Sequence, residues 1–538
     1  MNLLTLYLIC NQFGGVKKKW VKLYHNGVLF PPEYVKHNIP VIYNNKELIL
    51  EKEAEEAATF YAKYTGTEYI ENNKFRKNFW KDWKELLGDD HEIKSFDEVN
   101  FSLIREYLDK IKEEKKIISH EEKDIEKKAK EEEEKKYKIA YLDDKEEPIG
   151  NFRVEPPGIF LGRGDHPKIG RLKKRIYPED VTLNLSKDAP VPETIQGHNW
   201  GNIVHDRTVD WLASWKDTIS GKMKYVWLGA HSITKGLNDA AKFDVARKLK
   251  KKIKGIREQN FINMTDSELI MRQKATAVYF IDVFALRVGN EKGEDEADTV
   301  GVTSLRVEHI TIFEDSQIKL DFLGKDSVRY LNTVSVDPLV YNNLNEFIKD
   351  KTNGDQLFDM ITTNDVNKYL QTFMKGLTAK VFRTYNASYL FQKELAKVTK
   401  KYETYQGDDK IKLLLEEFNK ANLKVAKQMN HQKKISKSYT GQVIKISEQI
   451  KELRKKMKNA TSTRKTKIKM KISELKTKKN IKSEMKNLSL GTSKTNYIDP
   501  RITTAFIKIH NIPIDKLFTK ALQDKFKWAF DVDLDYKF

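Results

Sequence analysis

Apolar residues recur every three or four positions through much of the second half of the chain, and this spacing predicts helices from Lys242 onward. One such helix is expected to end at Gly289-Asn290, with Arg287 close to its last carbonyl groups. Its apolar members are Val278, Ile281, Phe284, Ala285 and Val288. Between Ile139 and about Ile233, proline and glycine separate short alternating runs, which predicts that strands dominate there.

Two highly charged segments also follow a helical pattern. The segment from Ile111 to Lys138 carries charges of both signs and is predicted to be one long exposed helix. Further on, a breaker run at Asn459–Thr463 separates two apolar stripes, which predicts two antiparallel helices that pack their stripes together. The stripes are Val443, Ile446, Ile450, Leu453 and Met457 on the first helix, and Ile468, Ile472 and Leu475 on the second.

The composition adds a basic net charge that is concentrated in this hairpin. The 538 residues, enough for about three or four folding units, carry a formal charge of +20. Nineteen basic and four acidic residues lie between Lys433 and Lys486. Such an excess favours a polyanionic partner such as nucleic acid, although a charge run is also typical of a solvated hairpin that binds nothing.

Several kinds of chemistry have no support in the sequence. The single cysteine, Cys10, excludes an internal disulfide framework, and the apolar run from Leu3 to Cys10 is too short to span a bilayer. A phosphate-binding loop of the Gly-x-x-x-x-Gly-Lys-Ser/Thr kind does not occur. Three aspartates near the end, Asp531, Asp533 and Asp535, alternate as in a short strand and lack the glycine and glutamate of a calcium loop. No metal and no cofactor are therefore expected.

If the partner is nucleic acid, any chemistry on its phosphodiester must come from side chains: a nucleophile, fixed cations and an acid for the leaving oxygen. Tyr497 is the candidate nucleophile, because Asp499 and Pro500 should cap a helix and leave this tyrosine just outside it, among polar neighbours. Arg383 is flanked by apolar residues, so its head should meet something buried or anionic. Lys325 lies in a turn between two predicted strands, where most lysines are merely solvated.

Each candidate also has a structural alternative. Arg287 could simply favour the dipole of its helix, and Tyr497 is one of 23 tyrosines. His431 stands at the edge of the basic hairpin, where a lone histidine is more often a surface residue than a catalyst.

Five motifs in this order resemble those of the eukaryotic type IB DNA topoisomerases. They are Ala-Leu-Arg-Val-Gly-Asn-Glu-Lys around Arg287, Asp-Phe-Leu-Gly-Lys-Asp-Ser around Lys325, Lys-Val-Phe-Arg-Thr-Tyr-Asn-Ala-Ser around Arg383, Asn-His-Gln around His431, and Ser-Lys-Thr-Asn-Tyr-Ile-Asp-Pro-Arg around Tyr497. The resemblance covers about Trp20 to Phe538.

The resemblance implies a role for each residue. Tyr497 would attack the phosphodiester and stay joined to the 3′ phosphate, while Arg287, Arg383 and His431 hold the phosphate oxygens and Lys325 protonates the leaving 5′ oxygen. DNA-binding positions are also implied, three of which line the pocket where camptothecin-type inhibitors stack in this family. These positions are Arg163, Asp326 and Asn496, together with Lys494 beside the tyrosine. The family relaxes double-stranded DNA without ATP or an obligatory metal.

The resemblance further implies an α+β fold that works as a multidomain DNA clamp, in a nuclear and monomeric protein. The expected parts are a divergent tail (1–19), a mixed cap and DNA-binding core (20–232), a mainly helical, tyrosine-recombinase-like catalytic core (233–434), an antiparallel coiled-coil linker (435–486) and a small helical domain with the tyrosine (487–538).

Two other classes fit parts of this pattern. A tyrosine recombinase or integrase uses a similar set of residues but joins strands from two sites, which would call for sequence-specific binding and a multimer. A non-catalytic architectural DNA-binding protein would use Tyr497 only structurally.

Overall fold

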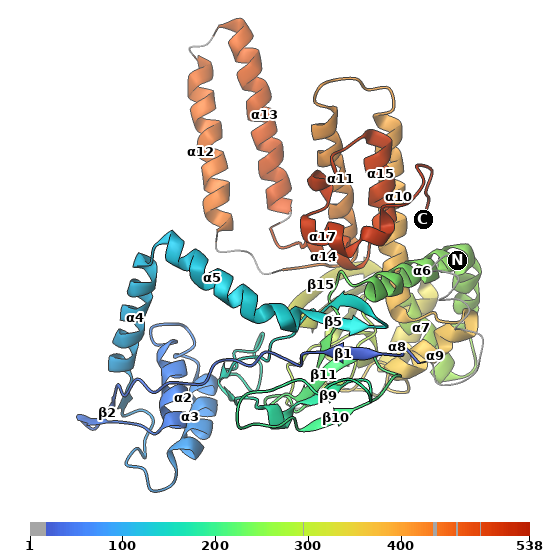
Figure 1. Ribbon diagram of the computed structural model, residues 1–538. Helices are drawn as coiled ribbons and strands as arrows, with labels where there is room; N and C mark the ends of the chain where they lie inside the picture. The colour runs from blue at the N-terminus through green and yellow to red at the C-terminus, as the bar shows by residue number, and fades with distance from the viewer. Residues whose placement is uncertain (1–17, 294, 434–437, 459–460, 485) are drawn as a thin grey trace. The chain divides into compact units, whose positions relative to one another are not determined.

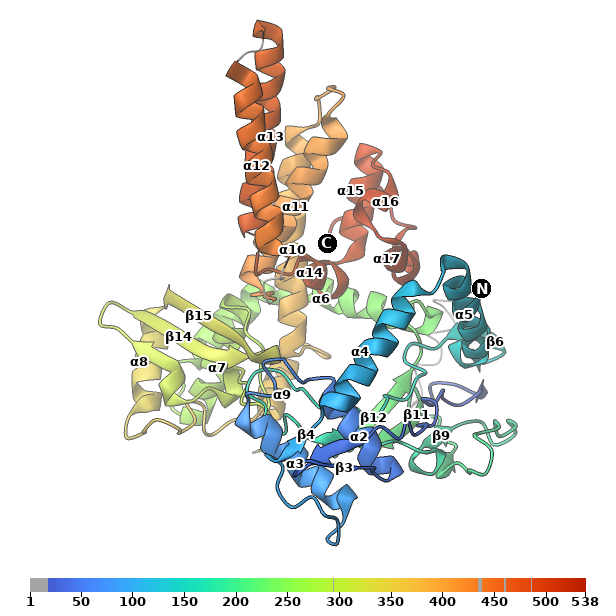
Figure 2. The same ribbon diagram turned by 90° about the vertical axis from the view of Figure 1, so that its left-hand side faces the viewer.

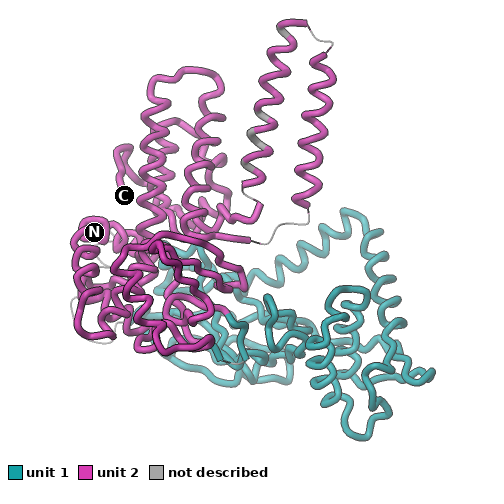
Figure 3. The backbone as a smooth tube through the Cα atoms, turned by 180° about the vertical axis from the view of Figure 1, so that it is seen from behind, with its two compact units in different colours: residues 1–236, 292–298 teal, residues 237–291, 299–538 magenta. Residues whose placement is uncertain are grey.

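The computed structural model describes residues 18–293, 295–433, 438–458, 461–484 and 486–538, and the chain forms two compact units (Figure 3). The first unit holds the described residues up to Gly236 together with Lys292–Asp298. The second holds Leu237–Glu291 and the described residues from Thr299 to Phe538. Two hydrophobic cores lie in the first unit, and one large core lies in the second. The domain boundaries inferred from the sequence stay predictions, and the expectation for Leu3–Cys10 lies outside the described residues.

An aromatic core fills one part of the first unit, where helices pack beside a small sheet of strand order β3-β2-β4. Tyr61 stacks on Phe79 with ring centroids 4.5 Å apart, and Phe79 stacks on Trp83 at 5.7 Å. The second helix begins where the Asn72 side chain accepts hydrogen bonds from the first backbone N–H groups of that helix. The elements are β2 (Val41–Tyr43), β3 (Lys46–Leu48), α2 (Lys52–Ala62), α3 (Asn73–Leu87) and β4 (Val99–Asn100).

The charged segment that was predicted as one long helix is two helices. Helix α4 (Ser102–Ile117) ends before Ile118, whose backbone is not helical. A separate helix, α5 (His120–Lys135), begins after Ser119. The cause is local: the Ser119 hydroxyl accepts from the backbone N–H of Glu122, while the Glu122 carboxylate accepts from the backbone N–H of Ser119. This capping box stabilises a helix start and therefore breaks the longer helix.

Strands dominate the remainder of the first unit, which confirms the prediction for this region. One sheet has the order β1-β5-β6, and a four-stranded sheet has the order β10-β9-β11-β12 with the β9 and β10 strands parallel. A separate apolar core lies among these strands. The elements are β1 (Leu23–His25), η1 (Lys136–Lys138), β5 (Ile139–Leu142), β6 (Lys145–Pro148), β7 (Gly158–Ile159), β8 (Leu172–Lys173), η2 (Pro178–Asp180), β9 (Thr182–Asn184), β10 (Asn202–Val204), β11 (Trp211–Lys216) and β12 (Met223–Trp227).

Helices return at Ile233, nine residues before the predicted position. Helix α6 (Ile233–Asn263) starts there because the Glu147 carboxylate accepts hydrogen bonds from the backbone N–H groups of Ile233 and Thr234, at 3.0 and 3.3 Å. The Ser232 hydroxyl also accepts from the Lys235 N–H at 3.0 Å. Glu147 lies on a strand far away in the sequence, so the spacing of apolar residues could not reveal this start.

The second unit is mainly helical and has one large core. A three-stranded antiparallel sheet, β13-β14-β15, is its sheet component among the described residues (Figure 2). Its further elements are α7 (Leu269–Val283), η3 (Val302–Ser304), η4 (Val307–His309), β13 (Ile310–Ile312), β14 (Gln317–Gly324), η5 (Lys325–Ser327), β15 (Val328–Ser335), α8 (Pro338–Ile348), α9 (Thr363–Phe373), α10 (Ala379–Lys401), α11 (Lys410–Gln428), α14 (Leu490–Asn496), α15 (Pro500–His510), α16 (Ile514–Leu517), α17 (Lys520–Lys525) and η6 (Lys527–Ala529).

The predicted basic hairpin is present. Helices α12 (Tyr439–Lys458) and α13 (Ser462–Glu484) run side by side (Figure 1), and their seam contains Ile446, Ile450 and Ile472 as buried residues. The α+β class is therefore confirmed. The clamp arrangement, the recombinase-like character of the catalytic region and the role of this hairpin as a linker stay predictions.

Candidate active site

The backbone of Tyr497 is held between two helices. Asp499 caps α15 by accepting from the Arg501 N–H, and Pro500 is the first helical residue, as the sequence predicted. Helix α14, which was not predicted, ends just before Tyr497, and its Ser493 carbonyl accepts from the Tyr497 N–H at 3.0 Å. Although its sequence neighbours are polar, Tyr497 is half-buried, and its ring packs against the core of the second unit.

Arg383 lies on α10 and is 4% exposed. Its two terminal nitrogens donate to the main-chain oxygens of Ala285 and Met429. The prediction of a buried head is confirmed, but these partners are neutral carbonyl groups, so the positive charge is not cancelled. The guanidinium carbon lies 5.1 Å from the centroid of the Tyr497 ring. A buried and uncancelled charge therefore faces the candidate nucleophile.

His431 is 3% exposed, so the alternative of a surface histidine is wrong. Its ring stacks on Tyr497 with centroids 4.9 Å apart and planes at 27°. Its Nδ1 lies 2.7 Å from the Ser493 hydroxyl, and its Nε2 lies 3.4 Å from a nitrogen of Arg383. Burial, aided by Arg383 and Arg287, lowers the pKa of His431 to about 3. The imidazole is therefore neutral near pH 7, and because Arg383 donates to Nε2, we assign its proton to Nδ1.

Arg287 does not belong to the last turn of a helix, contrary to the sequence prediction. Helix α7 ends at Val283. Two residues later, Ala285 has a left-handed backbone conformation with φ of 52°. The N–H of Leu286 then bonds back to the Phe280 carbonyl, which is a common way to close a helix. Because Arg287 lies four positions beyond Val283, the last residue of α7, the alternative in which it serves the helix dipole loses its support.

The loop that carries Arg287 is tightly packed. The Arg287 carbonyl oxygen accepts a hydrogen bond from the Val302 N–H at 2.9 Å, and Gly289, with φ of +91°, lies against Gly301. A Cβ atom on Gly289 would come within 2.8 Å of the Gly301 Cα, so no larger residue fits. This packing fixes the position from which the Arg287 side chain extends.

Lys325 occupies the tip of a hairpin, as predicted. Strands β14 and β15 pair up to Gly324 and Val328, and the 3₁₀ turn Lys325–Ser327 joins them. Asp326 and Ser327 both have positive φ, which gives the turn its tight shape.

Four of the five predicted catalytic residues line one pocket of about 110 Å³: Arg287, Lys325, Arg383 and His431. Tyr497 lies beside it, in contact with Arg383 and His431. Burial alone would raise the pKa of the Tyr497 phenol, but Arg383 and Arg287 outweigh this effect and hold that pKa below its ordinary value. The arrangement can bind a tetrahedral oxyanion next to a phenol that ionises unusually easily.

The other predicted DNA-binding residues have different settings. Asp326 lines the pocket, and Asn496 is exposed at the end of α14. Arg163 is exposed on a loop of the first unit. Lys494 points inward instead: its ammonium donates to the Leu517 carbonyl at 2.6 Å and lies 5.3 Å from the Phe418 ring, and burial lowers its pKa. DNA contact by these four residues stays a prediction.

Two serines that were not predicted as site residues contact the site. Ser493 meets the His431 ring, and Ser388 accepts and donates hydrogen bonds around the backbone of Tyr497. Both lie within motifs already noted, Ser-Lys-Thr-Asn-Tyr and Arg-Thr-Tyr-Asn-Ala-Ser, so proximity in sequence was the available signal.

Asp531, Asp533 and Asp535 lie in irregular backbone rather than in the expected strand. Across the described ranges, no three or more His, Cys, Asp or Glu side chains gather as metal ligands would. Of the helices in the described part of the chain, none is long and apolar enough to cross a membrane.

Three family models match consecutive parts of the chain. Residues 18–228 match "Eukaryotic DNA topoisomerase I, DNA binding fragment", and residues 231–464 match "Eukaryotic DNA topoisomerase I, catalytic core". Residues 469–538 match "C-terminal topoisomerase domain". Together these matches place the chain in the class of the topoisomerases.

Similar full-length proteins specify the family. DNA topoisomerase 1 beta of Arabidopsis thaliana is 45% identical over 98% of this chain and 60% of its own length. DNA topoisomerase 1 of Caenorhabditis elegans is 42% identical, over 96% of this chain and 67% of its own length, and that of Homo sapiens is 41% identical, over 97% and 72%. The chain belongs to the eukaryotic DNA topoisomerase I family. It spans about 60% of the length of the Arabidopsis relatives.

Proposed function

We propose that this chain relaxes supercoiled double-stranded DNA by cutting one strand, letting it rotate and resealing it. The observation that carries the proposal is the contact of both Arg383 and His431 with the Tyr497 ring, at 5.1 and 4.9 Å, beside a pocket that Arg287 and Lys325 also line. A phenol next to fixed cations is suited to attack a phosphodiester, because the cations stabilise charge that develops on the phosphate oxygens.

The proposed chemistry starts with the Tyr497 oxygen. Its proton passes to solvent water as the oxygen attacks phosphorus; a new oxygen–phosphorus bond forms, and the bond from phosphorus to the 5′ oxygen breaks. Arg287 and Arg383 hold the non-bridging oxygens. His431 would bind a further phosphate oxygen in its other neutral tautomer, in which Nε2–H donates to that oxygen and Nδ1 accepts from the Ser493 hydroxyl. Lys325 gives a proton to the departing 5′ oxygen.

Resealing reverses these steps. The 3′ phosphotyrosine keeps the energy of the broken ester, so the 5′ hydroxyl can attack it without ATP, and strain in the supercoiled DNA sets the direction of rotation. None of the proposed steps uses a metal ion or a cofactor.

The proposal extends to the surroundings of the site. Arg163, Asp326, Asn496 and Lys494 would contact DNA, and the first three would border the place where camptothecin-type inhibitors stack. The α12/α13 hairpin would lie near the duplex and act as a linker. The protein would act as a monomer in the nucleus.

The test is relaxation of a supercoiled plasmid by the purified chain in the presence of a chelator and without ATP. We expect relaxation by the wild type and none by Tyr497→Phe, which keeps the ring and loses the nucleophile. The matched control is Tyr405→Phe, since the hydroxyl of this exposed tyrosine bonds to Asp409 away from the pocket. Denaturation during the reaction should trap Tyr497 on the 3′ end of the break.

The same experiment separates the other classes. Adducts at a few short sites, with strands joined from two DNA molecules, would indicate a recombinase. Unchanged DNA-dependent behaviour of Tyr497→Phe, with no adduct in the wild type, would indicate an architectural protein and would overturn the proposal.

A further inference from the structure

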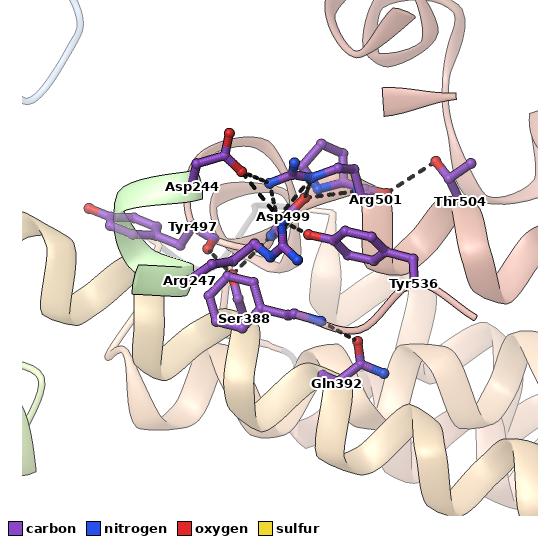
Figure 4. Close-up of polar contacts among 11 residues, drawn as sticks. Asp244, Arg247, Ser388, Gln392, Tyr497, Asp499, Arg501, Thr504 and Tyr536 are labelled. Carbon is purple, nitrogen blue, oxygen red and sulfur yellow. Dashed lines mark hydrogen bonds and ion pairs between the residues drawn. The ribbon is translucent and has the colours of Figure 1, made fainter. Parts of the chain in front are cut away.

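Ser388 connects the nucleophile segment to the helix that carries Arg383. Both residues lie on α10, five positions apart. The Ser388 hydroxyl donates to the Tyr497 carbonyl oxygen at 3.0 Å and accepts from the Asp499 N–H at 3.0 Å. It therefore binds the backbone at the nucleophile itself and two residues further on, as Figure 4 shows. Ser388 is fully buried, so water cannot replace either bond.

The far end of this connection is a buried carboxylate. Asp499 is fully buried and accepts from the Arg501 side chain at 2.8 Å and from the Tyr536 hydroxyl at 2.9 Å (Figure 4). Arg501 also reaches Asp244 on α6 at 2.9 Å. Burial and the Asp499 charge raise the pKa of Tyr536, so this phenol stays protonated and donates. The segment just after Tyr497 is thus fixed to several elements at once.

We propose that Ser388 is a positioning residue for the reaction, which sets the place of the Tyr497 phenol relative to Arg383, and that the Asp499–Tyr536 hydrogen bond supports it. The inference rests on the proposed function. With the backbone held at both points, the Tyr497 side chain has two torsions left, and its ring is already confined by His431 and Arg383. Loss of the serine hydroxyl would let the nucleophile segment shift against α10, and small misplacements of reacting groups slow reactions strongly.

The test compares the wild type with Ser388→Ala in two single-turnover assays. Cleavage is measured on an oligonucleotide duplex whose short 5′-hydroxyl fragment dissociates after the cut, and resealing is measured after a 5′-hydroxyl acceptor strand is added. We expect both rate constants to fall together, roughly tenfold to a hundredfold, because both directions share one transition state. The fraction of molecules that react, and the affinity for the uncleaved duplex, should stay unchanged. The midpoint of the curve of cleavage rate against pH should move to higher pH, because a Tyr497 phenol farther from the Arg383 charge has a higher pKa.

The matched control is Thr504→Val. This variant also removes one buried hydroxyl, but the Thr504 hydroxyl donates within α15, to the Pro500 carbonyl at 3.2 Å. It should lower stability in a similar way and leave both rate constants and the pH midpoint as in the wild type.

Tyr536→Phe is the second variant, and it decides the question if Ser388→Ala does not fold. It keeps the ring and removes only the bond to Asp499, so a slowing of roughly threefold to tenfold is expected, again equal for cleavage and resealing. Wild-type rate constants in the folded variants would overturn the inference. So would a lower reacting fraction with a normal rate constant, because that result indicates only a structural role.

The failure of the proposed function would look different. If the wild type forms no covalent adduct with DNA, the topoisomerase proposal falls, and this inference falls with it. If the wild type forms the adduct and Ser388→Ala forms it equally fast, only the positioning inference is overturned.

Discussion

The α12/α13 hairpin and the pocket beside Tyr497 are both basic, but they hold their charge in opposite ways. In the hairpin, lysine and arginine side chains such as Lys455 and Lys465 lie exposed around a thin apolar seam. In the pocket, Arg383 is 4% exposed and is held by main-chain oxygens. Exposed charges are strongly screened by water and salt, whereas a buried guanidinium is screened much less.

The pKa of the Tyr497 phenol shows this difference, because Arg383 and Arg287 hold it below its ordinary value against the effect of burial; for His431, burial lowers the pKa most and the two arginines add to that. In the proposed reaction the three cations of the pocket, Arg287, Lys325 and Arg383, act on a single bond, whereas the many cations of the hairpin would attract a polyanion without selecting a bond. Substitutions in the pocket should therefore change rate constants, and substitutions in the hairpin should change mainly the salt dependence of binding.

The largest effect is expected for Arg383→Ala. In the proposed reaction Arg383 stabilises the transition state, so its removal should slow single-turnover cleavage by roughly 10³-fold. DNA affinity should change little, because binding depends on many phosphate contacts. Arg383→Lys, which keeps the charge but not the two-pronged geometry, should recover part of the rate. Equal rates for Arg383→Ala and the wild type would show that the buried charge has no part in the chemistry.

Lys325→Ala should have the next largest effect, about 10²-fold on cleavage, if this lysine protonates the 5′ oxygen. A substrate whose bridging 5′ oxygen is replaced by sulfur needs no proton at the leaving group, so it should be cleaved by the variant and the wild type at similar rates. Arg383→Ala provides the contrast, because its defect should persist on the sulfur substrate. A defect of Lys325→Ala that persists as well would assign Lys325 to binding instead.

The elements that the sequence predicted well are those whose determinants are local. The hairpin seam followed from the spacing of Ile446 and Ile450, the start of α15 from Asp499-Pro500, and the β14–β15 turn from Gly324-Lys325. The break between α4 and α5 was also local, since Ser119 and Glu122 form a capping box that the sequence contains. It was missed because the surrounding charge pattern continues through it.

The parts that could not be predicted depend on contacts between distant residues. Apolar spacing continues past Val283, but α7 ends there, and the left-handed Ala285 presents its carbonyl oxygen to Arg383, 98 residues later. Arg287 follows two residues after Ala285, in a loop that lines the pocket. The burial of His431 likewise follows from Ser493 and Tyr497, more than sixty residues further along the chain. The candidate residues could be named from motifs, but their geometry could not.

Substitution of His431 should have an intermediate effect that depends on the replacement. His431 is neutral because its pKa is lowered to about 3, so a neutral hydrogen-bond donor can replace it. We expect His431→Gln to slow cleavage about tenfold and His431→Ala about 10²-fold, in the same single-turnover assay. A glutamine variant as slow as the alanine variant would indicate that the charged imidazole is the active form.

The pH dependence of folding gives a check on this assignment. The unfolded-state pKa of histidine is about 6.5, and the folded-state pKa of His431 is lower, so the unfolded chain takes up more protons between these values. The stability that His431 contributes is complete above about pH 6.5 and is lost as the pH falls toward 3. The His431→Gln variant should therefore lose less stability on acidification than the wild type does, as measured by urea unfolding at each pH.

The smallest effect on rate is expected for substitutions in the hairpin. These substitutions test whether its exposed charges act only on binding. The variant replaces Lys455, Lys456, Lys458 and Lys465, all exposed, by glutamine. Cleavage by the fully bound protein should change less than about threefold, because none of these side chains lines the pocket. The slope of log affinity against log salt should become shallower, by about 0.9 for each phosphate contact that is lost.

Filter binding across a salt series, with a parallel single-turnover assay at saturating protein, measures both quantities. The matched control replaces Lys110, Lys112, Lys115 and Lys123, which lie in the charge-balanced α4 and α5 helices. The same change in net charge should alter the slope less there, because acidic neighbours in these helices already offset the lysines. If both sets shift the slope equally, net charge alone governs binding, and the hairpin has no special place near the duplex. If the hairpin variant loses cleavage at saturation, its charge acts on the bond after all, and the distinction between the two basic regions disappears.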